Sequence, residues 1–292
     1  MNGDPHSLAA VRQAWICYLA CVLALAVGVR LVDDRVALAG FLAVHGALLG
    51  VALLLRADGR HARAAWSAFT LCGLPAVFSA VGLGLPDLHP QPYEWCWIAF
   101  DRWLLGTDPT VAVQAWLRPW STELLQLAYA TFYFLPIAVL VTLLRAGRHA
   151  AYDRCLCAVA VGFLLSYLGY YLFPTLPPYR YLEHGAPLRG LALAESVHGL
   201  LDTLEFNRFD CMPSGHTMLT LVTLALAWRY TPGLALVLTP LGVLLIAATV
   251  ALRYHYVADV LAGAVLAPLA LLAARFIAGG AGGRAAPGPG TR

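Results

Sequence analysis

The sequence predicts an all-α protein: a polytopic membrane bundle of about eight transmembrane helices, with one further amphipathic helix at the membrane interface. Composition is the first reason, because 60% of the 292 residues are hydrophobic, only 12% are charged and the mean hydropathy is +0.71. Soluble domains carry about 25% charged residues. The second reason is a series of apolar segments near the roughly 20 residues needed to cross a bilayer. They span 14–32, 36–55, 64–85, 123–144, 155–174, 215–229, 233–252 and 256–278.

Two of these segments need comment. The first also fits a secretory signal with Ala24-Leu25-Ala26 as its cleavage site, but only Arg12 supplies a basic charge before it. We therefore expect an uncleaved anchor. The sixth is short and needs the first turn of the preceding polar motif to reach across. Eight helices place both termini on one side.

An aromatic, amphipathic run occupies 93–105, inside the long connection 86–122. Its charged residues Glu94, Asp101 and Arg102 argue against a spanning helix, and its tryptophans suit the headgroup level. We expect three regions: N-terminal transmembrane helices of unknown role at 1–92, a catalytic membrane domain at 93–278 and a disordered Gly/Pro-rich tail at 279–292.

Charge predicts the orientation of the bundle. The chain has no lysine, and 11 of its 19 basic residues lie on the side that holds both termini. Short basic loops stay in the cytoplasm, so we expect cytoplasmic termini. The exclusive use of arginine indicates a GC-rich bacterial genome, and hence an inner-membrane protein whose opposite face is periplasmic. That face carries the second long connection, 175–213, and both polar motifs described next.

Other classes of function receive little support. A net charge of +3 without an aromatic, basic face gives no reason to expect nucleic acid as a partner. The seven cysteines are scattered through apolar runs without the spacing of a zinc site, and we interpret most of them as buried small hydrophobes. Cys211 is the exception, because it lies in the loop before His216.

The candidate site consists of two motifs at the ends of hydrophobic segments. The first, at 211–217, carries His216 after Pro-Ser-Gly, and the second, at 253–259, carries His255 with Asp259 four residues later on the same helical face. His255 is the candidate nucleophile, Asp259 would hold its other ring nitrogen, and His216 is the candidate acid and base. Ionisable groups at membrane depth are costly, so their pairing indicates function.

Phosphate binding is assigned to the residues around these motifs. Ser214 is the expected N-cap of a helix, and with Gly215 it would present free backbone N–H groups to a phosphate. Arg180 and Arg253 are candidate clamps on the phosphate oxygens. Tyr179 lies beside Arg180 after a stiff Pro-Pro pair and completes the predicted substrate-binding set.

These motifs resemble those of the type 2 phosphatidic acid phosphatase superfamily. Its second motif is P-S-G-H, matched at 213–216, and its third ends in H-x-x-x-D, matched by His255 and Asp259. The resemblance covers about residues 95–275. It implies a helical bundle, a phosphohistidine on His255 and protonation of the leaving group by His216, with no metal or other cofactor.

Two departures make the chain most like the inositol phosphorylceramide synthase and sphingomyelin synthase branch. The family's first motif, K-x6-R-P, cannot be present without lysine, and the arginine usual six residues before the histidine is replaced by Thr249. Loss of both resembles the lipid phosphotransferases. Residues 100–109, 173–179 and 248–259 are similar to the first of these enzymes, and 214–221 to the second.

Three functions stay open. The first is a lipid phosphotransferase that moves a phospho-headgroup from a phospholipid donor to a lipid alcohol acceptor such as ceramide or diacylglycerol. The second is a lipid phosphate phosphatase that uses water on phosphatidic acid or a polyprenyl phosphate. The third is a non-catalytic transporter or scaffold, which motifs at the membrane rim rather than the midplane disfavour. We expect either enzyme to keep its activity in EDTA.

Overall fold

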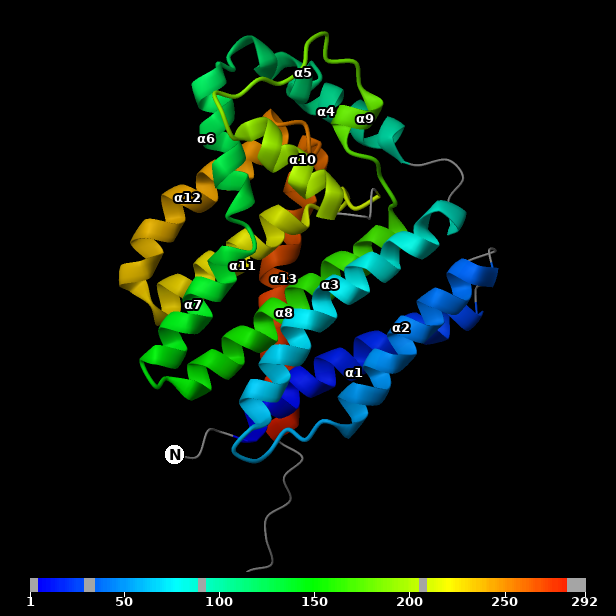
Figure 1. Ribbon diagram of the computed structural model, residues 1–292, viewed down its shortest axis with the longest axis vertical. Coiled ribbons are helices and arrows are strands. Elements are labelled where there is room, and N and C mark those ends of the chain that lie inside the picture. The colour runs from blue at the N-terminus through cyan, green and yellow to red at the C-terminus, as the bar shows by residue number, and fades with distance from the viewer. Residues whose placement is uncertain (1–4, 29–34, 89–92, 205–208, 283–292) are drawn as a thin grey trace, which may run out of the picture.

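The computed structural model describes residues 5–28, 35–88, 93–204 and 209–282, and within these ranges it consists of helices without a β-strand (Figure 1). The predicted all-α class is confirmed. The helices are α1 (Pro5–Gly28), α2 (Arg35–Leu54), α3 (Ala62–Leu88), α4 (Glu94–Leu105), α5 (Pro109–Ala112), the 3₁₀ turn η1 (Val113–Ala115), α6 (Pro119–Ala130), α7 (Phe134–Arg145), α8 (His149–Leu172), α9 (Pro178–Tyr181), α10 (Ala194–Leu204), α11 (Gly215–Tyr230), α12 (Pro232–Ala251) and α13 (Val257–Gly282).

All eight predicted segments coincide with helices, but not all are candidate spans. Among the described residues, six helices are long and apolar enough to cross a membrane: α1, α2, α3, α8, α12 and α13. The segment predicted at 123–144 is a pair, α6 and α7, bent by 49°. α11 has 16 residues and rises about 24 Å, less than the hydrocarbon core of roughly 30 Å. The structure therefore contains six or seven candidate spans, and the count of eight is not confirmed.

α8 forms the centre of the bundle. It packs against α1, α3, α7, α11 and α13 and is buried along most of its length (Figure 1). Small residues such as Ala158, Ala160 and Gly162 let these neighbours approach closely. Arg63 of α3 donates to both carboxylate oxygens of the buried Asp153 of α8, at 2.7 and 3.0 Å. The N-terminal helices α1 and α3 thus cover one side of the core around α8.

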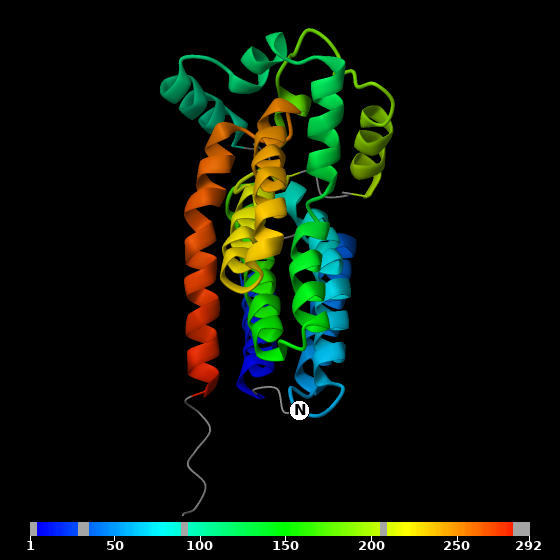
Figure 2. The same ribbon diagram turned by 90° about the vertical axis from the view of Figure 1, so that its left-hand side faces the viewer.

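The two ends of the bundle differ in character. The short helices α4, α5, α9 and α10, with α6, gather at one end, beyond the junction of α12 and α13 (Figures 1 and 2). The start of α1 and the end of α13 lie at the other end. This arrangement places both histidine motifs at the end with the short helices, as the order of the apolar segments predicts.

α4 has the amphipathic character predicted for 93–105. It exposes Trp95 and Trp103 on one side and buries Glu94, Ile98 and Asp101 on the other. The helix ends at Gly106, whose φ of 72° favours glycine. Two carboxylates on the buried face are unexpected for an amphipathic helix, because buried charge is costly unless it is hydrogen-bonded.

α13 extends further than predicted. It continues to Gly282, into the segment 279–292 that the Gly/Pro content predicts as a disordered tail. The remainder of that tail, 283–292, lies outside the described residues.

Candidate active site

The first motif forms a capped helix start, as predicted. Ser214 has extended backbone angles, and its Oγ accepts a hydrogen bond from the backbone N–H of Thr217 at 3.2 Å. Gly215 follows as the first residue of α11. A side chain there would lie 2.6 Å from Tyr170 Oη of α8, so the close approach of α8 requires glycine. His216 is thereby held in the first turn, where backbone N–H groups lack helical partners.

The second motif differs from the prediction that His255 and Asp259 share a helical face. α13 begins at Val257, so His255 lies in the loop before it. Asp259 reaches back from the first turn, and its Oδ2 lies 3.4 Å from His255 Nδ1 and accepts from the backbone N–H of Tyr256 at 2.9 Å. An acidic side chain at the third helical position commonly caps the N-terminus in this way. The same oxygen of Asp259 therefore contacts His255 and caps the start of α13.

The two motifs meet directly. His216 Nδ1 lies 3.3 Å from His255 Nε2, and the backbone N–H of Ser214 donates to the carbonyl of Asp259 at 3.0 Å. Gly263 of α13 permits this approach, because a side chain there would lie 2.5 Å from the carbonyl oxygen of Ser214. The structure thus brings together His216, His255 and Asp259, the three residues predicted to be catalytic.

Aromatic rings enclose His216. Tyr129 stacks on it with ring centroids 4.5 Å apart, and Phe132 lies on it at 4.2 Å. Both rings come from the bend between α6 and α7, which was predicted as one straight span. Sequence reasoning missed these residues, because it treated the segment as one span and did not use Pro136, which removes a helical N–H and disfavours a continuous helix at Phe132.

Several polar atoms of the site are buried without a hydrogen-bond partner among the described residues. They include His216 Nε2, Thr217 Oγ1 and Asp259 Oδ1. His255 is 3% exposed and Asp259 is fully buried. Buried polar atoms are nearly always bonded in folded proteins, so these atoms are available to a bound ligand or water.

The predicted clamps occupy the loops around the site. The guanidinium of Arg253 donates to Gln114 Oε1 at 2.6 Å and to the carbonyl of Ala186 at 2.9 Å. Arg180 is exposed, and its Nε donates to Tyr179 Oη at 3.1 Å. The backbone N–H of Tyr179 donates to the carbonyl of Arg253 at 3.1 Å. These three residues tie the outer loops together, and their contact with substrate stays a prediction.

A hydrogen-bonded group beside the histidines was also missed. Tyr254 Oη lies 2.6 Å from His198 Nδ1 of α10 and donates to Gln126 Oε1 of α6 at 3.2 Å. The ring of Tyr254 stacks on Tyr129 with centroids 4.2 Å apart. The only sequence signal was the position of Tyr254 next to His255.

Thr249, which stands where the family has arginine, has a structural role. It is fully buried, and its hydroxyl donates to the carbonyl of Ile246 at 2.6 Å. Its own carbonyl accepts from the backbone N–H groups of Tyr254 and His255, both at 2.9 Å. The residue thus helps to fix the loop that carries His255, and it brings no positive charge.

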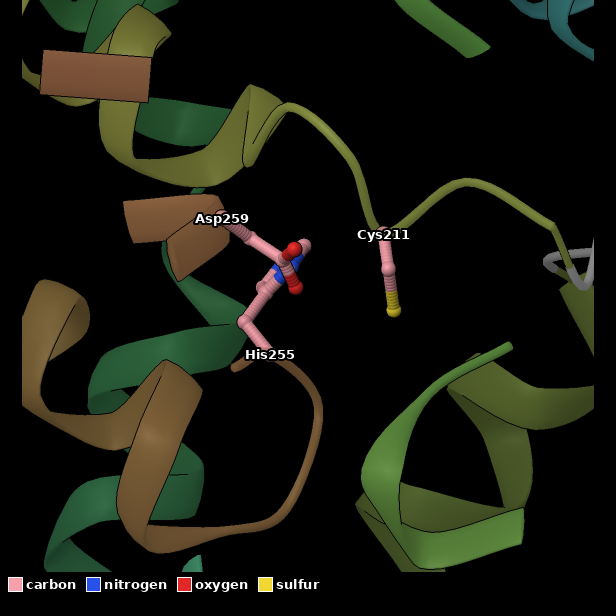
Figure 3. Close-up of side chains that lie close together, drawn as sticks. All are labelled: Cys211, His255 and Asp259. Atoms are coloured by element: carbon pink, nitrogen blue, oxygen red, sulfur yellow. The ribbon is translucent and has the colours of Figure 1, made fainter. Parts of the chain in front are cut away.

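Cys211 lies beside the pair of His255 and Asp259 (Figure 3). Its thiol donates to the carbonyl of Tyr254 at 3.1 Å, and one ligand atom from each of the three residues lies within 4.8 Å of the others. Tetrahedral zinc bonds of about 2.0–2.3 Å require ligand atoms roughly 3.5 Å apart. These three residues could therefore hold a soft divalent ion only after the side chains move closer.

Asp210 adds a second carboxyl group that the sequence reasoning did not single out. Its backbone forms an isolated bridge with Thr175. Burial raises the pKa of Asp210 to about 6, and the nearby His255 opposes that rise. His255 therefore lies within the electrostatic reach of Asp210 as well as Asp259.

Comparisons with known proteins agree with this geometry. Residues 97–273 match the PAP2 superfamily. Over 193 residues the chain is 24% identical to a "PA-phosphatase related-family protein" of Dictyostelium discoideum, a match that covers 58% of this chain and 35% of that protein. The chain thus spans about a third of that relative's length. No solved structure matches the chain. Because the superfamily match covers more than half of the sequence and includes both histidines, the chain belongs to the PAP2 superfamily.

Proposed function

We propose that the protein is a membrane lipid phosphotransferase that moves a phospho-headgroup between lipids through a phosphohistidine on His255. The observation that carries the proposal is the pair of contacts that joins His216 to His255 and His255 to Asp259, at 3.3 and 3.4 Å. Asp259 holds a proton on His255 Nδ1, so that Nε2 keeps its lone pair on the side of His216. A nucleophile, the carboxylate that orients it and an acid–base group therefore lie next to one another.

In the first half-reaction, His255 Nε2 attacks the phosphorus of a phospholipid. The bond to the lipid oxygen breaks, and His216 donates a proton to the departing alcohol. The phosphorus, with its headgroup, stays bound to His255, and Asp259 stabilises the positive charge on the ring. The first turn of α11, capped by Ser214, offers N–H groups to the non-bridging oxygens.

In the second half-reaction, the acceptor alcohol enters and His216 removes its proton. The acceptor oxygen attacks the phosphorus, the bond to His255 breaks, and the headgroup passes to the new lipid. The aromatic enclosure by Tyr129 and Phe132 supports a lipid acceptor, because it leaves His216 only 9% exposed and restricts water.

Charge supports a transferase over a phosphatase. A phosphodiester donor carries one negative charge, whereas a phosphate monoester carries up to two near neutral pH. The family's lysine motif is absent, and its usual arginine is the uncharged, buried Thr249. A site with fewer cations is better suited to the phosphodiester.

The second candidate is a lipid phosphate phosphatase, in which water replaces the acceptor alcohol. The likeness to the PA-phosphatase related-family protein of Dictyostelium favours it. His216 would then activate water, and the other residues would keep their roles. The two functions differ in whether water reaches the phosphohistidine.

Product analysis by mass spectrometry tests the proposal. Purified protein in mixed liposomes receives phosphatidylinositol or phosphatidic acid, with and without ceramide and diacylglycerol. We expect a new headgroup-bearing lipid whose formation requires the acceptor. Release of phosphate or headgroup phosphate at the same rate without an acceptor would establish the phosphatase instead.

Histidine variants complete the experiment. His255→Ala is expected to abolish turnover of either kind, because no phosphohistidine can form. His61→Ala is the matched control, since His61 is exposed at the start of α3, at the far end of the bundle. Full activity of His255→Ala would instead favour a chain that uses the fold without this chemistry.

A further inference from the structure

α4 is joined to the candidate active site through the carboxylate of Asp101. Asp101 Oδ2 accepts from the backbone N–H of Val257 and Oδ1 accepts from that of Ala258, both at 2.9 Å, across 156 and 157 residues of sequence. Only 1% of Asp101 is exposed. A side chain of an interfacial helix therefore caps the N-terminus of α13.

This cap lies directly beside the His–Asp pair. Val257 and Ala258 are the two residues between Tyr256, whose N–H is bound by Asp259, and Asp259 itself. The first N–H groups of a helix need acceptors from outside the helix. Asp101 binds the first two of them, and Asp259 binds the N–H of Tyr256, the residue just before the helix. The same Oδ2 of Asp259 lies 3.4 Å from His255 Nδ1.

We propose that Asp101 is a positioning residue for the His255–Asp259 pair. It binds the N–H groups of Val257 and Ala258, which would otherwise compete for the Asp259 carboxylate, and so keeps that carboxylate in contact with His255. Asp101 also occupies the positive end of α13. That leaves the phosphate to the N-terminus of α11, on the side of His216. The inference rests on the proposed use of His255 as the nucleophile.

The other carboxylate of α4 provides a matched control. Glu94 is also 1% exposed and accepts from a backbone N–H, but its partner is Leu176, in the loop before α9. Both side chains therefore anchor α4 to the bundle, and only Asp101 contacts the first turn of α13. A purely structural role of α4 would make the two residues equivalent.

The experiment compares Asp101→Asn with Glu94→Gln in liposomes, by turnover and by thermal unfolding. Asparagine keeps one acceptor oxygen but turns an NH₂ group toward the second N–H, so the cap is half lost. We expect both variants to unfold at a lower temperature. We expect kcat of Asp101→Asn to fall about 10²-fold, the cost of a small misplacement of reacting groups, with KM changed less than about twofold, and kcat of Glu94→Gln to stay within about threefold of wild type.

Two further variants sharpen the test. Asp101→Glu keeps the carboxylate and is expected to recover part of the lost kcat. Asp108→Asn removes the ion pair with the exposed Arg102 and one negative charge near Asp101 but leaves the cap in place, and it is expected to behave as wild type. Equal losses of kcat in Asp101→Asn and Glu94→Gln, or an unchanged kcat in Asp101→Asn, overturn the inference. Absence of both transfer and hydrolysis in the wild type would instead reject the proposed function.

Discussion

At the scale of single residues, one oxygen of Asp259 serves two partners. Its Oδ2 accepts from the N–H of Tyr256 and faces Nδ1 of His255. The position of a capping carboxylate is fixed by the backbone N–H groups that it binds, because these groups hardly move once a helix has formed. A carboxylate fixed in this way orients the imidazole of a residue in the loop before α13, which supports the proposed role of His255 as a nucleophile.

Asp210 yields a prediction about pH. An ordinary aspartate has a pKa of 3.8, whereas burial raises the pKa of Asp210 to about 6. The folded state then binds the proton more tightly than the unfolded state, so stability falls as pH rises from about 4 to above 6. Asp210→Asn removes that penalty. We expect the variant to unfold at a higher temperature than wild type at pH 7.5.

Thermal unfolding in detergent across pH 4 to 8 measures this difference. The difference between the two proteins is expected to become small near pH 4, where Asp210 stays protonated in the folded state and is about half protonated in the unfolded state. A variant that is less stable than wild type at pH 7.5 would mean that the ionised carboxylate has a favourable partner in the folded protein.

At the scale of elements, the site forms where the first turns of α11 and α13 meet. Each start is capped by a motif residue, Ser214 or Asp259, and a backbone hydrogen bond joins the two. The bend between α6 and α7 adds the aromatic enclosure, and α4 adds the Asp101 cap. The geometry of the candidate site therefore depends on how closely the helices approach, and not only on side-chain identity.

Gly263 tests that dependence. A methyl group there would lie 2.5 Å from the carbonyl oxygen of Ser214, so α13 must shift away from α11. We expect Gly263→Ala to destabilise the protein by about 1–3 kcal/mol, the usual cost of overpacking, and to lower kcat as the two histidines separate. Turnover and thermal unfolding measure the two effects.

Gly233→Ala is the control for this substitution. Gly233 lies in the first turn of α12, and a side chain there would meet no atom within 4 Å. Alanine favours a helix over glycine, so we expect unchanged turnover and equal or slightly higher stability. If both variants behaved alike, close packing at Gly263 would not control the site.

At the scale of the whole molecule, the two ends of the bundle differ. The start of α1 and the end of α13 lie at the end to which the sequence assigns most of the arginines, and the short helices lie at the opposite end. α4, which carries the exposed Trp95 and Trp103, lies at that second end (Figures 1 and 2). A lipid at the membrane interface would meet the site there. We propose that this end faces the periplasm of a bacterial inner membrane.

Reporter fusions after residue 292 test the orientation. The arginine distribution predicts a cytoplasmic C-terminus. A fluorescent protein fused there is expected to fold and fluoresce, and a periplasm-dependent alkaline phosphatase is expected to stay inactive. The opposite pattern would place the candidate active site in the cytoplasm.

Local patterns in the sequence were enough for the helical class, the positions of the apolar helices and the interfacial α4. They also singled out His216, His255 and Asp259 as candidate site residues, which the structure brings together, and the Ser214 cap, because polar motifs are conspicuous in an apolar chain. The boundaries were less certain. The sequence predicted one span at 123–144 and a helical His255, since hydropathy does not register a bend or the residue at which a helix begins.

The sequence by itself determined the membrane-embedded helical class and the chemical groups of the site, because composition and short motifs depend on neighbouring residues. Only the tertiary structure decided which distant residues complete that site. Tyr129, Phe132, Gly263 and Asp101 reach it through helix packing, and the interactions of Asp101 span more than 150 residues. Such contacts arise from the approach of whole helices, which no local pattern records.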